Sequence, residues 1–276
     1  MAGPFAGVPV REALASARIA REAAEGDSPR LDAELLLAHA LGIDRTRLMM
    51  DRDAPVEGAA VQAFQAAVRR RTVERVPTAY LLGEKGFRRL DLQVDPRVLI
   101  PRPDTEALVE WAVHGLPRGT RVLDVGTGSG AIALALKDER PDLEVTGTDV
   151  SPGAMEVARG NAARLGLDVR FVEGDLLAGE RADVVVSNPP YVETGAELAP
   201  EITLHEPAGA LFAGADGLDV YRRLVPAIIE VGARIAGLEV GAGQASSVRA
   251  LFPPAWETDV GRDLGGIDRV VSAWRP

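Results

Sequence analysis

Hydrophobic positions follow two different periods along the chain, and the change falls near residue 83. Before it, apolar residues recur three or four positions apart, as on one face of an amphipathic helix. One segment starts at Ser28-Pro29, a capping residue followed by proline at the first helical position, and stops at Gly42. Further predicted helices cover residues 9–24 and the stretch with Val61, Phe64 and Val68 on one face. Residues 1–82 are therefore predicted to form a small helical bundle.

The next stretch predicts a β-hairpin between two domains. Leu90, Leu92 and Val94 alternate with polar residues, which is the two-residue period of a strand. We expect this hairpin linker to occupy residues 83–99. The next segment, IPRPDTE at residues 100–106, is predicted to start a helix, because it carries a proline followed by acidic residues. The helix dipole favours acidic residues in the first turn of a helix.

From residue 121 onward, apolar runs alternate with helical stretches. Runs that are apolar at nearly every position indicate strands covered on both faces, and hence a parallel sheet between layers of helices. Strands are predicted at residues 121–125, 143–148, 169–172, 183–187, 235–240 and 269–274. Helices are predicted near residues 131–138, 153–165, 217–232 and 243–252. Residues 100–276 are thus interpreted as one α/β domain.

Composition and charge narrow the class of protein. The 276 residues are 46% apolar, enough for a sizeable core and too many for a disordered chain. No apolar run approaches the roughly 20 residues that cross a bilayer, and the N-terminus lacks the pattern of a secretory signal. Because there is no cysteine and the three histidines are far apart, no metal site is expected. The net charge of −10 argues against direct binding of duplex nucleic acid. We expect a cytoplasmic protein with no membrane association.

A glycine-rich loop closes the strand predicted at 121–125. It reads Asp124-Val125-Gly126-Thr127-Gly128-Ser129-Gly130, and Asp149 ends the next strand, 23 residues after Gly126. Glycines allow a tight turn against a ligand, and a carboxylate at the second strand suits the hydroxyls of a ribose. The loop satisfies the patterns of dinucleotide-binding proteins and of methyltransferases that use S-adenosyl-L-methionine (AdoMet). Asp124 favours AdoMet, because a carboxylate at this position can bind the methionine ammonium but would be unfavourable beside the negative charges of a pyrophosphate. The start of the next helix can take the methionine carboxylate.

A second motif, Asn188-Pro189-Pro190-Tyr191, directly follows the strand predicted at 183–187. It matches the [N/D]-P-P-[Y/F/W] signature of methyltransferases that act on planar nitrogens. Such a nitrogen is a poor nucleophile because its lone pair is delocalised into the adjacent π system. An asparagine oxygen and a backbone carbonyl can each accept one N–H, which orients the nitrogen and favours the charge that builds on it. Proline presents its carbonyl rigidly without a competing N–H, and Tyr191 offers a flat wall.

Together with these motifs, residues 83–276 closely resemble the release-factor glutamine methyltransferases of the HemK/PrmC type. The segments that carry the resemblance are Gly83–Phe87, VLIPRPDTE at 98–106, DVGTGSGAIALAL at 124–136, SNPPY at 187–191, EPAGAL at 206–211 and LGGIDRVV at 264–271. The resemblance implies a Rossmann-like, seven-stranded class I methyltransferase domain with a small N-terminal helical domain joined by a β-hairpin. It also implies methyl transfer from AdoMet to the side-chain amide nitrogen (N5) of the glutamine in the Gly-Gly-Gln motif of peptide-chain release factors.

The resemblance further implies roles for individual residues. Asp149 would bind the ribose, Asp175 and Leu176 would face the adenine, and the 102–106 segment would lie over the AdoMet pocket. Asn188 would border the AdoMet site and hold the glutamine amide by its side chain, and Pro189 would hold it by its carbonyl. The residues implied at the methionine end are Asp124, Gly126, Thr127, Gly128, Ser129 and Gly130, and those implied at the pocket wall are Pro190 and Tyr191.

Three other functions compete with this interpretation. An RNA or DNA amino-methyltransferase would need base flipping and a basic surface, and neither is indicated. A nicotinamide-dependent oxidoreductase would leave the motif at 188–191 unexplained, as would a non-catalytic binding module. We expect a monomer whose N-terminal helices dock the release factor, because a tripeptide alone offers little contact area.

Overall fold

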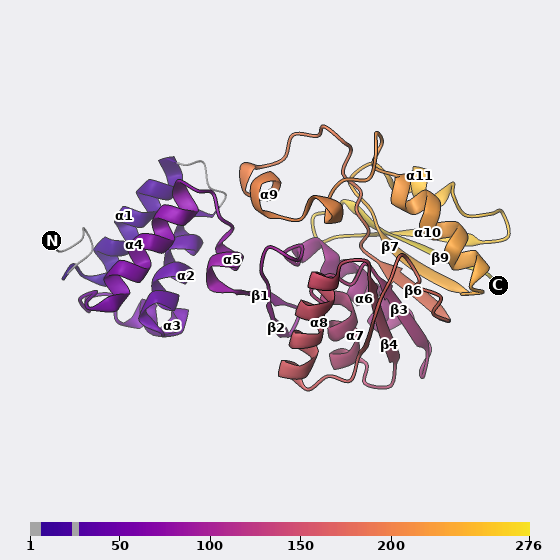
Figure 1. Ribbon diagram of the computed structural model, residues 1–276, viewed down its shortest axis with the longest axis horizontal. Helices are drawn as coiled ribbons and strands as arrows, with labels where there is room; N and C mark the ends of the chain where they lie inside the picture. Colours follow the sequence, from indigo (N-terminus) through magenta and orange to yellow (C-terminus); the bar gives the residue numbers. More distant parts are fainter. Residues whose placement is uncertain (1–6, 24–27) are drawn as a thin grey trace. The chain divides into compact units, whose positions relative to one another are not determined.

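The computed structural model describes residues 7–23 and 28–276 and divides the chain into two units (Figure 1). The helical unit contains the described residues up to Gly83 together with Leu198–His205. The α/β unit contains Glu84–Glu197 and Glu206–Pro276. Within the described residues, no helix is long and apolar enough to span a membrane.

Short amphipathic helices build the helical unit. They are α1 (Val10–Ala23), α2 (Pro29–Leu41), α3 (Arg45–Met50), α4 (Ala59–Thr72), α5 (Thr78–Leu82) and α9 (Pro200–His205). Leu37, Leu48 and Phe64 are completely buried in their shared core. The predicted helices α1, α2 and α4 are confirmed, although Ala24 at the predicted end of α1 lies outside the described residues. The six-residue α3 and five-residue α5 were not predicted, because such short helices show no full period of apolar positions.

The two ends of α2 test the residues that the sequence predicts to start and end this helix. Pro29 occupies the first turn, and Gly42 ends the helix with a left-handed φ of 65°, as predicted. The side chain of Ser28, in contrast, makes no capping hydrogen bond. The expectation that Ser28 caps α2 is therefore wrong, since its backbone (φ −137°, ψ 61°) departs from the extended geometry of a capping residue.

Helix α9 joins the helical unit from a distant part of the sequence, shortly after the Asn188–Tyr191 motif. Its Glu201 accepts hydrogen bonds from Arg71 at 3.1 Å and from Arg75 at 2.9 Å. Arg71 also donates to Asp32 of α2 at 3.0 Å, and all these side chains are largely buried. Ion pairs, rather than an apolar face, therefore attach α9 to the other helices of this unit. Hydrophobic periodicity alone could not predict this helix.

The α/β unit begins with a hairpin of β1 (Glu84–Phe87) and β2 (Leu90–Gln93), which pair antiparallel. Leu90 and Leu92 are buried, whereas Asp91 and Gln93 between and after them are exposed. The predicted alternation and the hairpin are therefore confirmed.

A seven-stranded sheet follows, with strand order β5-β4-β3-β6-β7-β9-β8. The first five strands in this order are parallel, and β9 runs antiparallel to both β7 and β8. The strands are β3 (Arg121–Val125), β4 (Glu144–Asp149), β5 (Arg170–Glu173), β6 (Val184–Ser187), β7 (Ile235–Glu239), β8 (Glu257–Arg262) and β9 (Asp268–Trp274). The predicted Rossmann-like fold is confirmed, but β8 was missed, because this edge strand has no buried residue and no apolar run.

Helices cover both faces of the sheet (Figure 1). Val122, Val184 and Val186 pack under α6, α7 and α8, and Leu123, Val125 and Val185 face the other way, under α10 and α11. Burial on both faces explains the unbroken apolar runs of the central strands. The helices of this unit are η1 (Pro103–Thr105), α6 (Glu106–Gly115), α7 (Ala131–Glu139), α8 (Pro152–Leu165), η2 (Ala208–Ala210), α10 (Asp219–Glu230) and α11 (Ala245–Arg249).

The strand order reverses at β3. The chain proceeds from β3 through β4 to β5 on one side and then returns to β6 and β7 on the other. In open α/β sheets, ligands bind at the carboxyl ends of the strands beside such a reversal. The loops after β3, β4 and β6 carry the glycine loop, Asp149 and Asn188, so the topology brings the predicted motifs to one edge.

Candidate active site

The glycine loop turns tightly between β3 and α7. The backbone N–H groups of Gly126 and Thr127 both donate to the carbonyl of Thr148 in β4, at 2.8 and 2.9 Å. Gly126, Gly128 and Gly130 have φ values of 73°, 56° and 84°, a left-handed region that suits glycine. A Cβ added to Gly126 or Gly128 would meet no atom within 4 Å, so these two residues leave open space beside the loop. The loop therefore offers a ligand close access to its backbone.

Asp149 ties this loop to the end of β4. One carboxylate oxygen accepts the backbone N–H of Gly128 at 2.9 Å, and the other accepts that of Ser151 at 2.9 Å. Each carboxylate oxygen has two lone pairs, so Asp149 can still accept the hydrogens of two hydroxyl groups. This arrangement suits the predicted binding of a ribose.

Asp124 is completely buried below the loop and only partly satisfied. Its Oδ2 accepts from the Thr127 hydroxyl at 2.6 Å and from the Ala133 N–H at 3.2 Å, whereas Oδ1 has no hydrogen-bond partner within the described chain. Burial raises the pKa of Asp124 to about 7, and the nearby Asp149 adds to the rise. A buried acceptor without a partner is costly, and a cationic donor would relieve the cost. The loop and Asp124 thus fit the methionine ammonium of AdoMet.

The predicted adenine residues follow β5. The N–H of Gly174 donates to the carbonyl of Asp149 at 2.9 Å, so this loop lies next to the end of β4. The carbonyl of Leu176 accepts the Thr148 hydroxyl at 2.7 Å, and Leu176 itself has a left-handed φ of 49°. The Asp175 side chain is exposed and paired with Arg223 of α10. The roles of Asp175 and Leu176 toward adenine stay predictions.

Asn188 lies beside the glycine loop because of strand register. β3 and β6 pair with Val125 opposite Ser187, and the Ser187 hydroxyl donates to the Val125 carbonyl at 2.6 Å. Gly126 and Asn188 therefore leave neighbouring strands at the same level. The Nδ2 of Asn188 donates to the hydroxyl of Thr105 at 3.0 Å, which leaves its Oδ1 as the acceptor for another molecule.

The rest of the motif is held from the α10 side of the sheet. The carbonyl of Tyr191 accepts the Nε2 of Gln244 at 2.9 Å, and a Cβ on Gly241 would lie 3.1 Å from the Tyr191 ring. Pro189 is buried and Pro190 is half-buried. Burial also raises the pKa of the Tyr191 hydroxyl, which therefore stays neutral at ordinary pH.

Three residues of the site were given no individual role from the sequence, although Thr105 lies in the 102–106 segment expected over the AdoMet pocket. Thr105, at the end of η1, is buried and contacts Asn188 directly. Glu206 is buried and accepts from Arg102 at 2.6 Å, which fixes the segment just before η1. Glu239, the last residue of β7, is completely buried. The one signal in the sequence that could have pointed to Glu239 is that it is an acidic residue inside the apolar run at 235–240.

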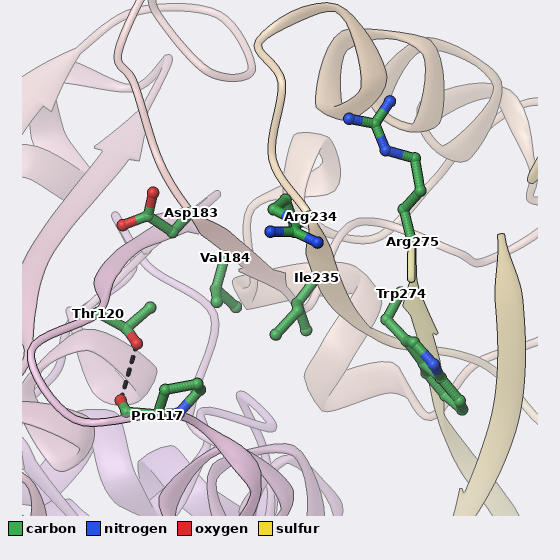
Figure 2. A pocket seen from close by; sticks show the side chains of 8 residues that line it. All are labelled: Pro117, Thr120, Asp183, Val184, Arg234, Ile235, Trp274 and Arg275. Carbon is green, nitrogen blue, oxygen red and sulfur yellow. Dashed lines mark hydrogen bonds between the residues drawn. The ribbon is translucent and has the colours of Figure 1, made fainter.

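A separate cavity of about 480 Å³ lies at the opposite, amino-terminal edge of the central strands (Figure 2). It is lined by Pro117, Thr120, Asp183, Val184, Arg234, Ile235, Trp274 and Arg275. The glycine loop and Asn188 lie at the other ends of these strands, so this cavity is not part of the candidate active site.

The fold and the two motifs at its carboxyl edge are those of a class I methyltransferase, with AdoMet as its cofactor. Residues 12–83 match the family described as PrmC N-terminal domain, and residues 104–211 match the methyltransferase small domain. The chain is 43% identical over 255 residues to the release factor glutamine methyltransferase of Geobacter sulfurreducens, covering 89% of each chain. It is 42% identical over 279 residues to that of Mycolicibacterium smegmatis, covering 96% of this chain and 98% of the relative.

The chain therefore belongs to the release factor glutamine methyltransferase family, as the resemblance implied. Among solved structures, the Mtq2–Trm112 complex of E. cuniculi, responsible for the methylation of the eRF1 translation termination factor, is similar in fold. The TM-score is 0.50 at 23% identity, over 65% of this chain and 99% of the matched chain.

Proposed function

We propose that this protein transfers a methyl group from AdoMet to the side-chain amide nitrogen (N5) of the glutamine in the Gly-Gly-Gln motif of peptide-chain release factors. The observation that carries the proposal is the orientation of Asn188, whose Nδ2 is engaged by Thr105 at 3.0 Å and whose Oδ1 is left to accept. Relatives across almost the whole chain are release factor glutamine methyltransferases, which supports the same substrate here.

In this proposal, Asn188 and Pro189 orient the glutamine amide. The Oδ1 of Asn188 accepts one hydrogen of the amide NH₂ group, and the carbonyl of Pro189 accepts the other. Both acceptors stabilise the positive charge that develops on the nitrogen during attack. Tyr191 bounds the pocket with a neutral ring, and Pro190 keeps the backbone rigid. When bound, AdoMet supplies an electrophilic methyl group on a sulfonium whose leaving group is a neutral thioether. No base among the described residues is required, because the product can lose its proton to water.

The chain's own residues also define how AdoMet would be held. Gly126, Gly128 and the start of α7 would receive the methionine carboxylate, and the free Oδ1 of Asp124 would receive the ammonium. Asp149 would accept the ribose hydroxyls, and the loop with Asp175 and Leu176 would face the adenine. Thr127, Ser129 and Gly130 complete the loop, and Asn188 borders the sulfonium.

We also propose that the helical unit docks the release factor and that the enzyme acts as a cytoplasmic monomer. Hydrogen–deuterium exchange on the intact protein should then show protection within residues 28–83 when a release factor is added. Light scattering of the purified protein should give the mass of one chain, 29.2 kDa. A dimer mass, or protection confined to the α/β unit, would contradict these two assignments.

The activity is tested by incubating the protein with labelled AdoMet and an intact release factor. We expect label in a release factor with Gly-Gly-Gln and none when the glutamine is replaced by alanine. Label that persists in the alanine form would place the methyl group on another residue. The cofactor is tested by measuring the equilibrium affinity of the protein for AdoMet and for NAD. Tighter binding of NAD would reject the proposal.

A further inference from the structure

Glu239 is a buried carboxylate at the catalytic edge of the sheet that the reaction as described does not use. It is the last residue of β7 and is 0% exposed. In the described residues, neither of its carboxylate oxygens has a hydrogen bond of good geometry. A buried carboxylate without partners is costly, so its presence in an otherwise apolar strand calls for a role.

Strand register places Glu239 opposite Asn188. In the parallel pair of β6 and β7, Val184 lies opposite Ile235 and Val186 opposite Gly237. Continuing by two residues puts Asn188 opposite Glu239, on the same face of the sheet. Gly237 packs directly against Trp111 of α6, so this face is the one covered by η1 and α6.

Thr105 contacts Asn188 and carries the hydroxyl group through which Glu239 can act on it. It ends η1, is 4% exposed, and its Oγ1 accepts the Nδ2 of Asn188 at 3.0 Å. A hydroxyl group has one hydrogen, which Thr105 can donate only to another acceptor. The interaction of this hydroxyl with Glu239 is the strongest of those that hold the pKa of Glu239 down against burial. The hydroxyl therefore accepts from Asn188, and its one hydrogen can turn toward the carboxylate of Glu239.

The direction of this chain depends on Glu239 being an acceptor. An ionised carboxylate can only accept, so it orients the Thr105 hydrogen toward itself and the Thr105 lone pair toward Asn188. Asn188 must then donate with its amide nitrogen and present Oδ1 to the substrate. A neutral acid or an amide at position 239 can donate to Thr105, so the hydroxyl can reverse and Asn188 can present NH₂ to the substrate instead.

Other charged groups around Glu239 are engaged elsewhere. Arg269 of β9 pairs with Asp104 and Asp263, both at 2.9 Å. Arg102 pairs with Glu206 at 2.6 Å. From α10, the Tyr221 hydroxyl donates to the backbone carbonyl of Glu239 at 2.6 Å, not to the carboxylate. Burial raises the pKa of Glu239 to about 7; Arg102 and Arg269 lower it, and Asp104 raises it. Tyr191 is the remaining titratable neighbour, and it stays neutral.

We propose that Glu239 is a positioning residue, which acts through the Thr105 hydroxyl to keep the oxygen of Asn188 turned toward the substrate amide. This inference rests on the proposed function for its catalytic consequence, but the orientation of Asn188 is a property of the free protein. The two can therefore be tested separately.

The orientation is tested by NMR without any substrate. The chain has only two asparagines, Asn161 and Asn188, so labelling asparagine with ¹⁵N gives two side-chain NH₂ pairs. The Asn188→Ala variant assigns them. Asp124 also has a pKa of about 7 at this edge, so the titration is measured in Asp124→Asn. We expect the Asn188 pair to shift between pH 5 and 9 with a midpoint near 7 in this variant, and to be unresponsive when Glu239→Gln is added. Asn161, which donates to the carbonyls of Gln93 and Ser129, is the internal reference. An unresponsive Asn188 pair in Asp124→Asn, or a response that persists when Glu239→Gln is added, would overturn the inference.

The catalytic consequence is tested with saturating AdoMet and release factor. Glu239→Gln and Thr105→Val should each lower kcat by about 10²-fold, as expected for a misplaced reacting group, with little change in KM. The double variant should lose no more than either single one, because both break the same connection. Thr105→Ser should recover most of the rate, and the exposed Glu257→Gln on β8 should match the wild type. Additive losses, or wild-type kcat in Glu239→Gln, would refute the role. Absence of methylation by the wild type would reject the proposed function and leave the NMR result standing.

Discussion

Replacing Asn188 by alanine removes the side-chain acceptor that the proposed mechanism assigns to the substrate amide. Asn188 is half-buried and makes one hydrogen bond, Nδ2 to the Thr105 hydroxyl at 3.0 Å. The substitution therefore leaves Thr105 without one neutral hydrogen bond, which is worth about 0.5–1.5 kcal/mol of folding free energy. The free energy of unfolding should fall by no more than this, so the variant should fold and can be assayed.

The expected loss of rate is larger than the loss of stability. In the transition state the nitrogen gains positive charge, and a hydrogen bond from such a group is worth about 1.5–3 kcal/mol. This corresponds to roughly 10- to 150-fold in rate, and misalignment of the nitrogen adds to the loss. We therefore expect kcat to fall by about 10²-fold or more. Asn188→Asp keeps an oxygen acceptor at the same place, so it should retain more activity than the alanine variant.

The assay measures transfer of labelled methyl groups to an intact release factor, with separate titration of AdoMet binding. Alanine should lower kcat while the Kd for AdoMet changes little, since the glycine loop, Asp124 and Asp149 are intact. Wild-type kcat in the alanine variant would refute the alignment role of Asn188. Equal losses in the alanine and aspartate variants would show that the acceptor oxygen is not what the reaction needs.

Two further predictions concern the AdoMet site. Asp149→Ala removes the acceptor for the N–H groups of Gly128 and Ser151 and the proposed acceptor for the ribose hydroxyls. Calorimetry should then show AdoMet affinity weaker by about 10²-fold, and unchanged affinity would reject the ribose assignment. Burial raises the pKa of Asp124 to about 7 in the folded protein, above its value in the unfolded chain. The free energy of unfolding should therefore fall as the pH rises from about 4 through 7, and the stability that the protonated form contributes is lost over this range. An ammonium beside it favours the ionised form, so AdoMet binding at pH 6 should release a proton and tighten toward pH 8. Calorimetry in buffers of different ionisation enthalpy measures this release, which Asp124→Asn should abolish.

The sequence was sufficient to predict the elements that bury apolar surface on a regular period. Every strand of the central sheet except β8 appeared in the sequence as an apolar run. The glycine loop and the Asn188–Tyr191 motif were identified directly from their residues. Elements that attach in other ways were missed. β8 is an edge strand without a buried residue, and α9 is held by Glu201 between two arginines. Neither leaves a hydrophobic pattern, because backbone hydrogen bonds and ion pairs do not require apolar side chains at regular positions.

The roles of Thr105 and Glu239 toward the predicted Asn188 could not be read from the sequence for a different physical reason. Thr105, Asn188 and Glu239 are separated by 83 and 51 residues, and nothing local distinguishes a threonine that ends a 3₁₀ turn from one that caps a helix. Their relation arises from the parallel register of β6 and β7, which fixes one face, and from η1 covering that face. Motifs identify the groups that touch the reactants, because those groups are dictated by reaction chemistry. The groups that orient them are dictated by which strands become neighbours, and here that depends on the reversal of strand order at β3. An acid inside a buried apolar run, as Glu239 is at the end of β7, is the one local sign of such a group, since burial without a partner has no structural benefit.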